Sequence, residues 1–130
     1  MNLNSIIIFV CEHGAAKSVM AASYFNKLAR EKKLDFHAIA RGTHPDSEFS
    51  SNTIAGLRED GLAPDESIPT QLTQEDVESA QRIISFCDLK DEYHQKVIVE
   101  QWEGVPPVSE DYQVSRDAIL ERIHKLIDHL

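Results

Sequence analysis

One stretch near the start of the chain constrains the fold most: an apolar run that leads through a short loop into a helical pattern. The apolar run is Ser5–Val10, which is typical of a buried strand. The loop begins at Cys11, and Lys17 and Ser18 stand where the helical pattern opens. A cysteine therefore ends a strand, and a cation and a hydroxyl begin a helix.

This arrangement predicts an oxyanion site beside a nucleophile. In such a loop the backbone N–H groups turn inward, and the helix N-terminus adds donors and partial positive charge. The expected oxyanion-binding residues are Glu12, His13, Gly14, Ala15, Ala16, Lys17 and Ser18. The same field stabilises a thiolate, so we expect Cys11 to be nucleophilic. A nucleotide P-loop is disfavoured because Cys11 and Ala16 occupy its two glycine positions.

The stretch Phe9–Ala21 resembles the active-site loop of the low-molecular-weight protein tyrosine phosphatase superfamily, which includes the thioredoxin-coupled arsenate reductases. The usual pattern there is Cys-x5-Arg-Ser, and this chain has Cys-x5-Lys-Ser. Further matches at Ala40–Thr43, Gly61-Leu62, Gln71–Asp76 and Ile83–Asp88 extend the resemblance over nearly the whole chain.

Alternating strand and helix patterns predict one α/β domain over residues 1–130. We expect strands at 5–10, 35–40, 82–86 and 96–100, and helices at 18–33, 51–60, after Thr73, at 91–94 and up to Leu130. Strands separated by helices indicate a parallel sheet with helices on both faces, a three-layer α/β/α fold. The resemblance implies four strands in the order 2-1-3-4. Ligands bind beyond the carboxyl ends of such strands, where Cys11, Gly42-Thr43 and Cys87-Asp88 should converge.

The resemblance also implies a mechanism and site residues. Cys11 would attack the phosphorus of a phosphotyrosine-like monoester, Lys17 would replace the oxyanion-binding arginine, and Ser18 would bond the thiolate. In the family an aspartate in a late loop protonates the leaving group, but Pro106 or Pro107 falls at its place here. Asp111 or Glu110 could serve instead. Both could equally be carboxylates at the start of the last helix.

Three side chains leave alternatives open. The ammonium of Lys17 is a point charge that cannot grip two oxygens as a guanidinium does, so we expect a slow or specialised enzyme. His13 could brace the loop, favour the thiolate as a cation, or be an exposed loop residue. Arg41 replaces a small residue of the family pattern and could add a second cation to the oxyanion or form a structural ion pair.

Two alternative functions remain. In arsenate reductases a relay of cysteines follows the nucleophile, and Cys87 matches the first relay cysteine. The second would fall near His94, where no cysteine stands, so a Cys11–Cys87 disulfide or an external thiol reductant would be needed. Cys87 could instead be a buried thiol at a strand end. The third possibility is a catalytically weak sensor of phosphate, arsenate or a phosphoprotein.

Composition limits the partners. The net charge of −9 argues against nucleic acid and anionic membranes, and the longest apolar run, Ile6–Cys11, is too short to cross a bilayer. Two cysteines suggest free thiols in a reducing cytoplasm. We expect no metal and no cofactor, because the six histidines lack paired spacing and the His44–Glu48 stretch is interpreted as loop. The loop after the second strand and Val105–Tyr112 should wall the pocket. Trp102 or Tyr112 could stack on an aryl substrate there or could be a core residue.

Overall fold

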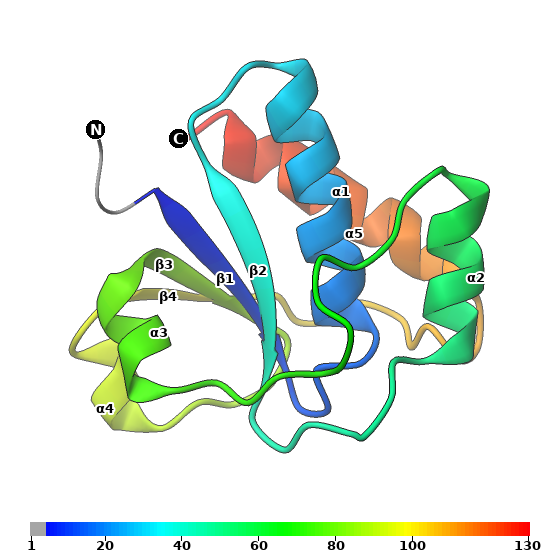
Figure 1. Cartoon of the computed structure of the whole chain (residues 1–130). Helices are drawn as coiled ribbons and strands as arrows, with labels where there is room; N and C mark the ends of the chain where they lie inside the picture. Colours follow the sequence, from blue (N-terminus) through cyan, green and yellow to red (C-terminus); the bar gives the residue numbers. More distant parts are fainter. Residues whose placement is uncertain (1–4) are drawn as a thin grey trace.

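The strands form one parallel sheet in the order β2-β1-β3-β4 (Figure 1). The computed structural model describes residues 5–130, so the first four residues of the expected domain lie outside it. The strands are β1 (Ile6–Cys11), β2 (His37–Gly42), β3 (Ala80–Ser85) and β4 (Ile98–Gln101). The order is the one predicted.

Helices cover both faces of this sheet, which confirms the three-layer α/β fold. They are α1 (Lys17–Glu31), α2 (Ser51–Glu59), α3 (Gln74–Ser79), α4 (Asp91–His94) and α5 (Tyr112–Ile127). α1, α2 and α5 lie on one side of the sheet and α3 and α4 on the other (Figure 1). Within residues 5–130, no helix has the length and apolar character that crossing a membrane requires.

The apolar run of β1 is continuous because both of its faces are buried, as is usual in parallel sheets. Ile7 and Phe9 point into the core shared with α1 and α5, while Ile8 and Val10 point into a smaller core on the α3 side. The Phe9 ring centroid lies 5.6 Å from that of Trp102. Trp102, which directly follows β4, therefore packs into the larger core. Full burial of each such side chain stabilises the fold by about 1.5–3 kcal/mol.

Side-chain caps fix where three helices begin. Ser50 caps α2, one residue before the expected position, by accepting from the Thr53 amide at 3.3 Å. Thr73 and Asp76 form the predicted capping box of α3. Asp111 caps α5. Strand ends shift by one or two residues from the prediction. The carboxyl ends of β1 and β2 lie later than expected because the two strands stay paired as far as Cys11 and Gly42.

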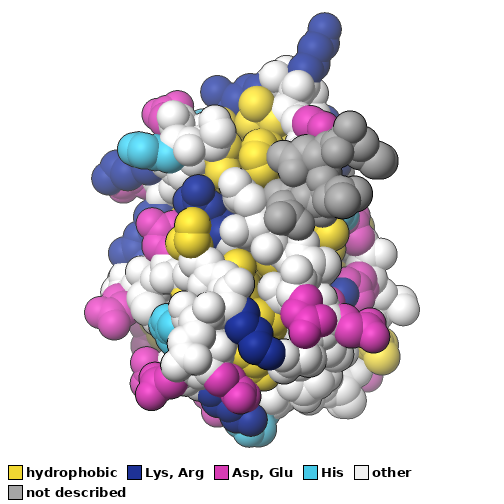
Figure 2. All heavy atoms as spheres, turned by 90° about the vertical axis from the view of Figure 1, so that its left-hand side faces the viewer, with side chains coloured by type: hydrophobic (Ala, Val, Ile, Leu, Met, Phe, Trp, Pro, Cys, Tyr) yellow, Lys and Arg dark blue, Asp and Glu magenta, His cyan; other side chains and the backbone are white. Residues whose placement is uncertain are grey.

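The outer surface on the α3 and α4 side carries charges of both signs. Acidic and basic side chains are interspersed over it, and hydrophobic atoms show only in separate areas (Figure 2). On this face the basic side chains are therefore separated by acidic ones and form no continuous basic patch, in keeping with the net charge of −9.

A polar cluster joins the three helices on the other side. The Tyr24 hydroxyl donates to Asp60 Oδ2 at 2.5 Å and lies 2.8 Å from the Tyr112 hydroxyl. Burial raises the pKa of Tyr24 well above its usual value, and the hydrogen bond to Asp60 adds to the effect, so the phenol stays protonated. The Tyr112 ring lies directly over Gly56 of α2, where an added Cβ would stand 2.2 Å from the ring.

We predict that Gly56→Ala lowers the free energy of unfolding by about 1–3 kcal/mol, because the new methyl group overlaps the Tyr112 ring. Chemical denaturation measures this change. In a Tyr112→Ala background the same substitution should be neutral or stabilising, since alanine favours a helix by about 1 kcal/mol over glycine. An equal loss in both backgrounds would show that the ring is not the cause.

Candidate active site

The sulfur of Cys11 lies at the carboxyl end of β1, against the first turn of α1. Its Sγ is 2.9 Å from the Ser18 hydroxyl oxygen, and Ser18 is fully buried. Cys11 itself keeps 8% of its surface exposed. A buried hydroxyl beside a cysteine can donate to the thiolate and so favours the charged form of the sulfur. The pairing that the sequence predicted between these two residues is therefore present.

The carbonyl groups of the loop after Cys11 face a neighbouring segment, residues 43–50. The amides of Thr43, His44, Asp46 and Ser50 donate to the carbonyls of Cys11, Glu12, His13 and Ala15 at 2.7–3.3 Å. The amides of residues 12–16 have no acceptor among the described residues. These N–H groups are therefore available to an oxyanion above the cysteine, as in other phosphate-binding loops.

The N-terminus of α1 is also left without a side-chain cap. Ala16 stands at the cap position, and the first turn holds no acidic residue. α2, α3 and α5 all begin at a residue whose side chain accepts a backbone amide. The uncapped amides and the helix dipole of α1 thus remain free to act on an anion.

Two glycines let the loop and the end of β2 approach each other. Gly14 has a φ of +60°, and a Cβ there would lie 3.0 Å from the Gly42 nitrogen. A Cβ at Gly42 would lie 2.8 Å from the Gly14 nitrogen. The two backbones are therefore in direct contact, which a side chain at either position would prevent.

An open cleft surrounds Cys11 and is lined by three segments. They are the loop itself, residues 46–50, and Pro107, Val108 and Ser109. Lys17 lines this cleft, and its ammonium donates one hydrogen bond to the Val105 carbonyl at 2.8 Å. An ammonium has three donors, so two remain for an oxyanion. The two segments that we expected to wall the pocket do so.

Asp111 does not belong to the groups that line this cleft. Its carboxylate accepts the Val114 amide at 3.2 Å as the cap of α5, and both Asp111 and Glu110 border a separate hollow against α2. The expected role of Asp111 as general acid is therefore not supported by its contacts. The helix start takes the carboxylate because capping satisfies an otherwise unpaired amide.

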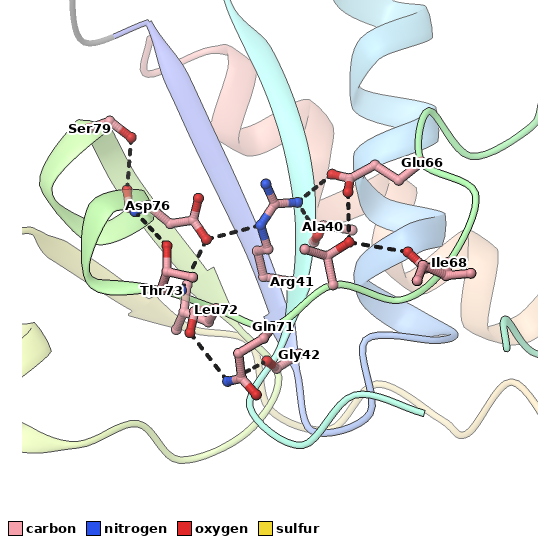
Figure 3. A network of polar contacts seen from close by, with 11 residues as sticks. Ala40, Arg41, Gly42, Glu66, Ile68, Gln71, Leu72, Thr73, Asp76 and Ser79 are labelled. Atoms are coloured by element: carbon pink, nitrogen blue, oxygen red, sulfur yellow. Dashed lines mark hydrogen bonds and ion pairs between the residues drawn. The ribbon is translucent and has the colours of Figure 1, made fainter. Parts of the chain in front are cut away.

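Arg41 is held by two carboxylates (Figure 3). Its Nε donates to Asp76 Oδ2 at 3.0 Å, and its other guanidinium nitrogen Nη1 pairs with Glu66. Burial lowers the pKa of Arg41 but the hydrogen bonds to Glu66 and Asp76 outweigh it, so the pKa stays raised. Of the two alternatives, the contacts are those of the structural ion pair, which connects β2 to α3 through Asp76 and to the segment before α3 through Glu66.

Neither aromatic candidate lines the cleft. Trp102 is packed between Phe9 and Phe86 in the core, and Tyr112 lies on α2. The aromatic side chain that reaches the cleft is Phe49, which the sequence analysis did not select. Phe49 lies just before the cap of α2, in a segment that was already expected to wall the pocket. That position could have identified it as a cleft residue.

Three acidic side chains and one histidine also line the cleft. Sequence reasoning treated Asp46 and Glu48 as plain loop, but both face it together with Glu12 and His13. His13 Nδ1 lies 3.3 Å from Asp46 Oδ1, and its Nε2 lies 3.9 Å from Glu12 Oε2. Among residues 5–130, no group of three metal-ligating side chains is assembled here or elsewhere.

Cys87 lies just beyond β3, the strand next to β1. Both cysteines are free thiols, and Cys87 is partly buried with its sulfur 3.6 Å from the Ser85 hydroxyl. Burial raises the pKa of the Cys87 thiol, the hydrogen bond from Ser85 opposes this, and negative charge at Cys11 raises it further. The Phe86 amide donates to the Val10 carbonyl at 2.8 Å, so the ends of β1 and β3, at or just after which the two cysteines stand, lie side by side as expected.

Comparison with known families decides the relationship. The sequence profile of the low molecular weight phosphotyrosine protein phosphatase family matches residues 6–128. The chain belongs to this family. No curated protein matches the sequence.

Solved structures of the family share the fold at low identity. A low molecular weight protein tyrosine phosphatase from T. tengcongensis is 20% identical with a TM-score of 0.78, covering 98% of this chain and all of that one. An arsenate reductase from Archaeoglobus fulgidus is 24% identical with a TM-score of 0.73, covering 94% and 98%. The YwlE arginine phosphatase of Bacillus subtilis, with a phosphorylated active-site serine, is 21% identical with a TM-score of 0.81, covering 96% and 95%.

We predict that iodoacetamide at neutral pH alkylates Cys11 before Cys87, because Ser18 and the free loop amides favour the Cys11 thiolate while burial raises the pKa of Cys87. Mass spectrometry of time points distinguishes the two sites. Ser18→Ala should slow alkylation of Cys11 by about tenfold, the effect of losing one hydrogen bond to a charged group. Its rate at Cys87 is the internal control, and equal initial rates at both thiols would contradict the assignment.

Proposed function

We propose that the protein is a cysteine-dependent phosphatase that hydrolyses phosphate monoesters. The observation that carries this proposal is the buried Cys11–Ser18 contact at 2.9 Å beneath a loop whose amides lack acceptors in the described chain. An anion site alone needs no thiol, whereas a thiol held by a hydroxyl among anion-binding amides suits covalent attack. Membership of the phosphatase family supports the same reaction.

The chemistry would proceed in two steps. The Cys11 thiolate attacks phosphorus, the loop amides and Lys17 bind the three non-bridging oxygens, and the P–O bond to the leaving group breaks. Water then attacks the phosphocysteine, inorganic phosphate leaves, and the Ser18 hydroxyl stabilises the departing thiolate. These roles are assigned residue by residue to Cys11, Lys17, Ser18 and the amides of residues 12–16.

Lysine at position 17 makes the reaction slower than with arginine. A guanidinium bonds two oxygens in one plane, while the Lys17 ammonium is a point charge that already donates to Val105. Loss of a preorganised donor costs a factor of about 10²–10³ in rate. The substrate class we propose is a phosphotyrosine-like monoester, because Phe49 and Pro107 give the cleft an apolar wall for a ring.

The test is hydrolysis of p-nitrophenyl phosphate between pH 5 and 8 by the wild type, Cys11→Ser and Cys87→Ser. We expect turnover in the wild type and in Cys87→Ser, and none in Cys11→Ser. The good leaving group of this ester makes the assay tolerant of a weak general acid. No turnover by the wild type, with phosphate still bound in calorimetry, would favour an oxyanion sensor instead.

Arsenate reduction is the second candidate, and the position of Cys87 favours it. Two thiols at the carboxyl ends of adjacent strands could each give one electron to arsenic, so that As(V) becomes As(III) and a Cys11–Cys87 disulfide forms. An external dithiol such as that of thioredoxin would then have to reduce the disulfide. In this reaction Cys87 is needed, whereas in the phosphatase reaction it is not.

We therefore predict that the wild type incubated with arsenate under anaerobic conditions forms no Cys11–Cys87 disulfide and releases no arsenite, since Cys87 is held as a thiol by burial. Peptide mapping and arsenic speciation measure the two products. Arsenite release that depends on both cysteines would overturn this expectation and make the reductase the main function.

A further inference from the structure

The late loop brings no acid to the cleft. Its contribution there is Pro107, Val108 and Ser109, and the carboxylate of Asp111 is occupied as a helix cap. A phosphatase of this kind must still protonate the departing oxygen when the leaving group is poor. The proton donor must therefore come from another segment that lines the cleft.

The loop after Cys11 and the segment after β2 supply a paired acid and carboxylate. His13 Nδ1 lies 3.3 Å from Asp46 Oδ1, and the Asp46 amide donates to the His13 carbonyl at 3.0 Å. The pair is thus held by a side-chain contact and a backbone hydrogen bond. Both side chains remain more than half exposed and both line the cleft that contains Cys11.

We propose that His13 is the general acid of the reaction and that Asp46 is the positioning residue that orients its ring. This inference rests on the proposed phosphatase function. Asp46 Oδ1 lies at ion-pair distance from Nδ1, which leaves Nε2 to carry the transferable proton, as in catalytic carboxylate–histidine pairs. The other charged groups around the ring are Glu12, with Oε2 at 3.9 Å from Nε2, and Lys17 and Glu48 in the same cleft.

The proton balance of the two steps follows. As the S–P bond forms and the P–O bond breaks, Nε2 of the imidazolium gives its proton to the leaving oxygen, and the ring becomes neutral. The neutral ring then takes a proton from the attacking water as the S–P bond breaks. Inorganic phosphate, the Cys11 thiolate and the imidazolium are regenerated, so no further reactant is required.

The experiment compares kcat/KM for p-nitrophenyl phosphate and phenyl phosphate, whose leaving groups differ in their need for a proton. For His13→Gln we expect a loss of about 10²-fold with phenyl phosphate and of less than about tenfold with p-nitrophenyl phosphate. Asp46→Asn should show the same selectivity with a smaller loss. His44→Gln is the matched control, an exposed histidine in the same segment that does not line the cleft, and should match the wild type.

The pH profile separates proton donation from a structural role. With phenyl phosphate the wild type should lose activity on the alkaline side, because a neutral imidazole has no proton to give, and His13→Gln should lack this limb. Equal losses for both esters, or no loss for either, would overturn the inference while leaving the phosphatase function intact. A selective loss in Asp46→Asn but not in His13→Gln would overturn it by making Asp46 the donor. Absence of p-nitrophenyl phosphate turnover in the wild type would overturn the phosphatase function and this inference together.

Discussion

Backbone hydrogen bonds between the loop after Cys11 and residues 43–50 fix the conformation of the loop on which the candidate site depends. Amides of that segment donate to the carbonyls of Cys11, Glu12, His13 and Ala15, while the amides of residues 12–16 have no acceptor among the described residues. The contact depends on Gly14 and Gly42, because the two backbones meet without room for a side chain. The anion site is therefore a consequence of how β1 and β2 end together, rather than of the loop sequence alone.

The helix next to Cys11 differs from three of the other helices in how its first turn is capped. In α2, α3 and α5 a hydroxyl or carboxylate side chain accepts a hydrogen bond from an amide of the first turn, and Asp111 is one of these caps. α1 lacks such a cap, and the hydroxyl in its first turn, Ser18, points to the sulfur instead. At the start of α2, α3 and α5 a polar side chain stabilises the helix, whereas at the start of α1 the Ser18 hydroxyl contacts the sulfur of Cys11.

Features that depend on local sequence were predictable, and those set by long-range packing were not. The Thr73 capping box follows from short-range capping, while the strand order and the Cys11–Ser18 pair were implied by the family resemblance of local motifs. The role of Arg41 could not be predicted because its partners, Glu66 and Asp76, lie 25 and 35 residues further along the chain.

The same limit applied to the walls of the cleft. Both wall segments were predicted, but which of their side chains face the sulfur was not, because irregular backbone has no period from which to read direction. Asp46 and Phe49 were missed for this reason, and the role of Trp102 was left open between cleft and core because its packing partner Phe9 lies in a distant strand.

The segment between β4 and α5 is anchored to the rest of the fold at several points, and this limits how far that wall of the cleft can move. The Trp102 amide bonds Ser85, Val105 and Val108 are buried, and Tyr112 at the far end is held by Tyr24. A wall anchored at this many points cannot swing over the substrate as a lid does. In the proposed phosphatase reaction, a cleft without such a lid leaves water as the acceptor most available to a phosphocysteine, which favours hydrolysis over transfer to a second substrate.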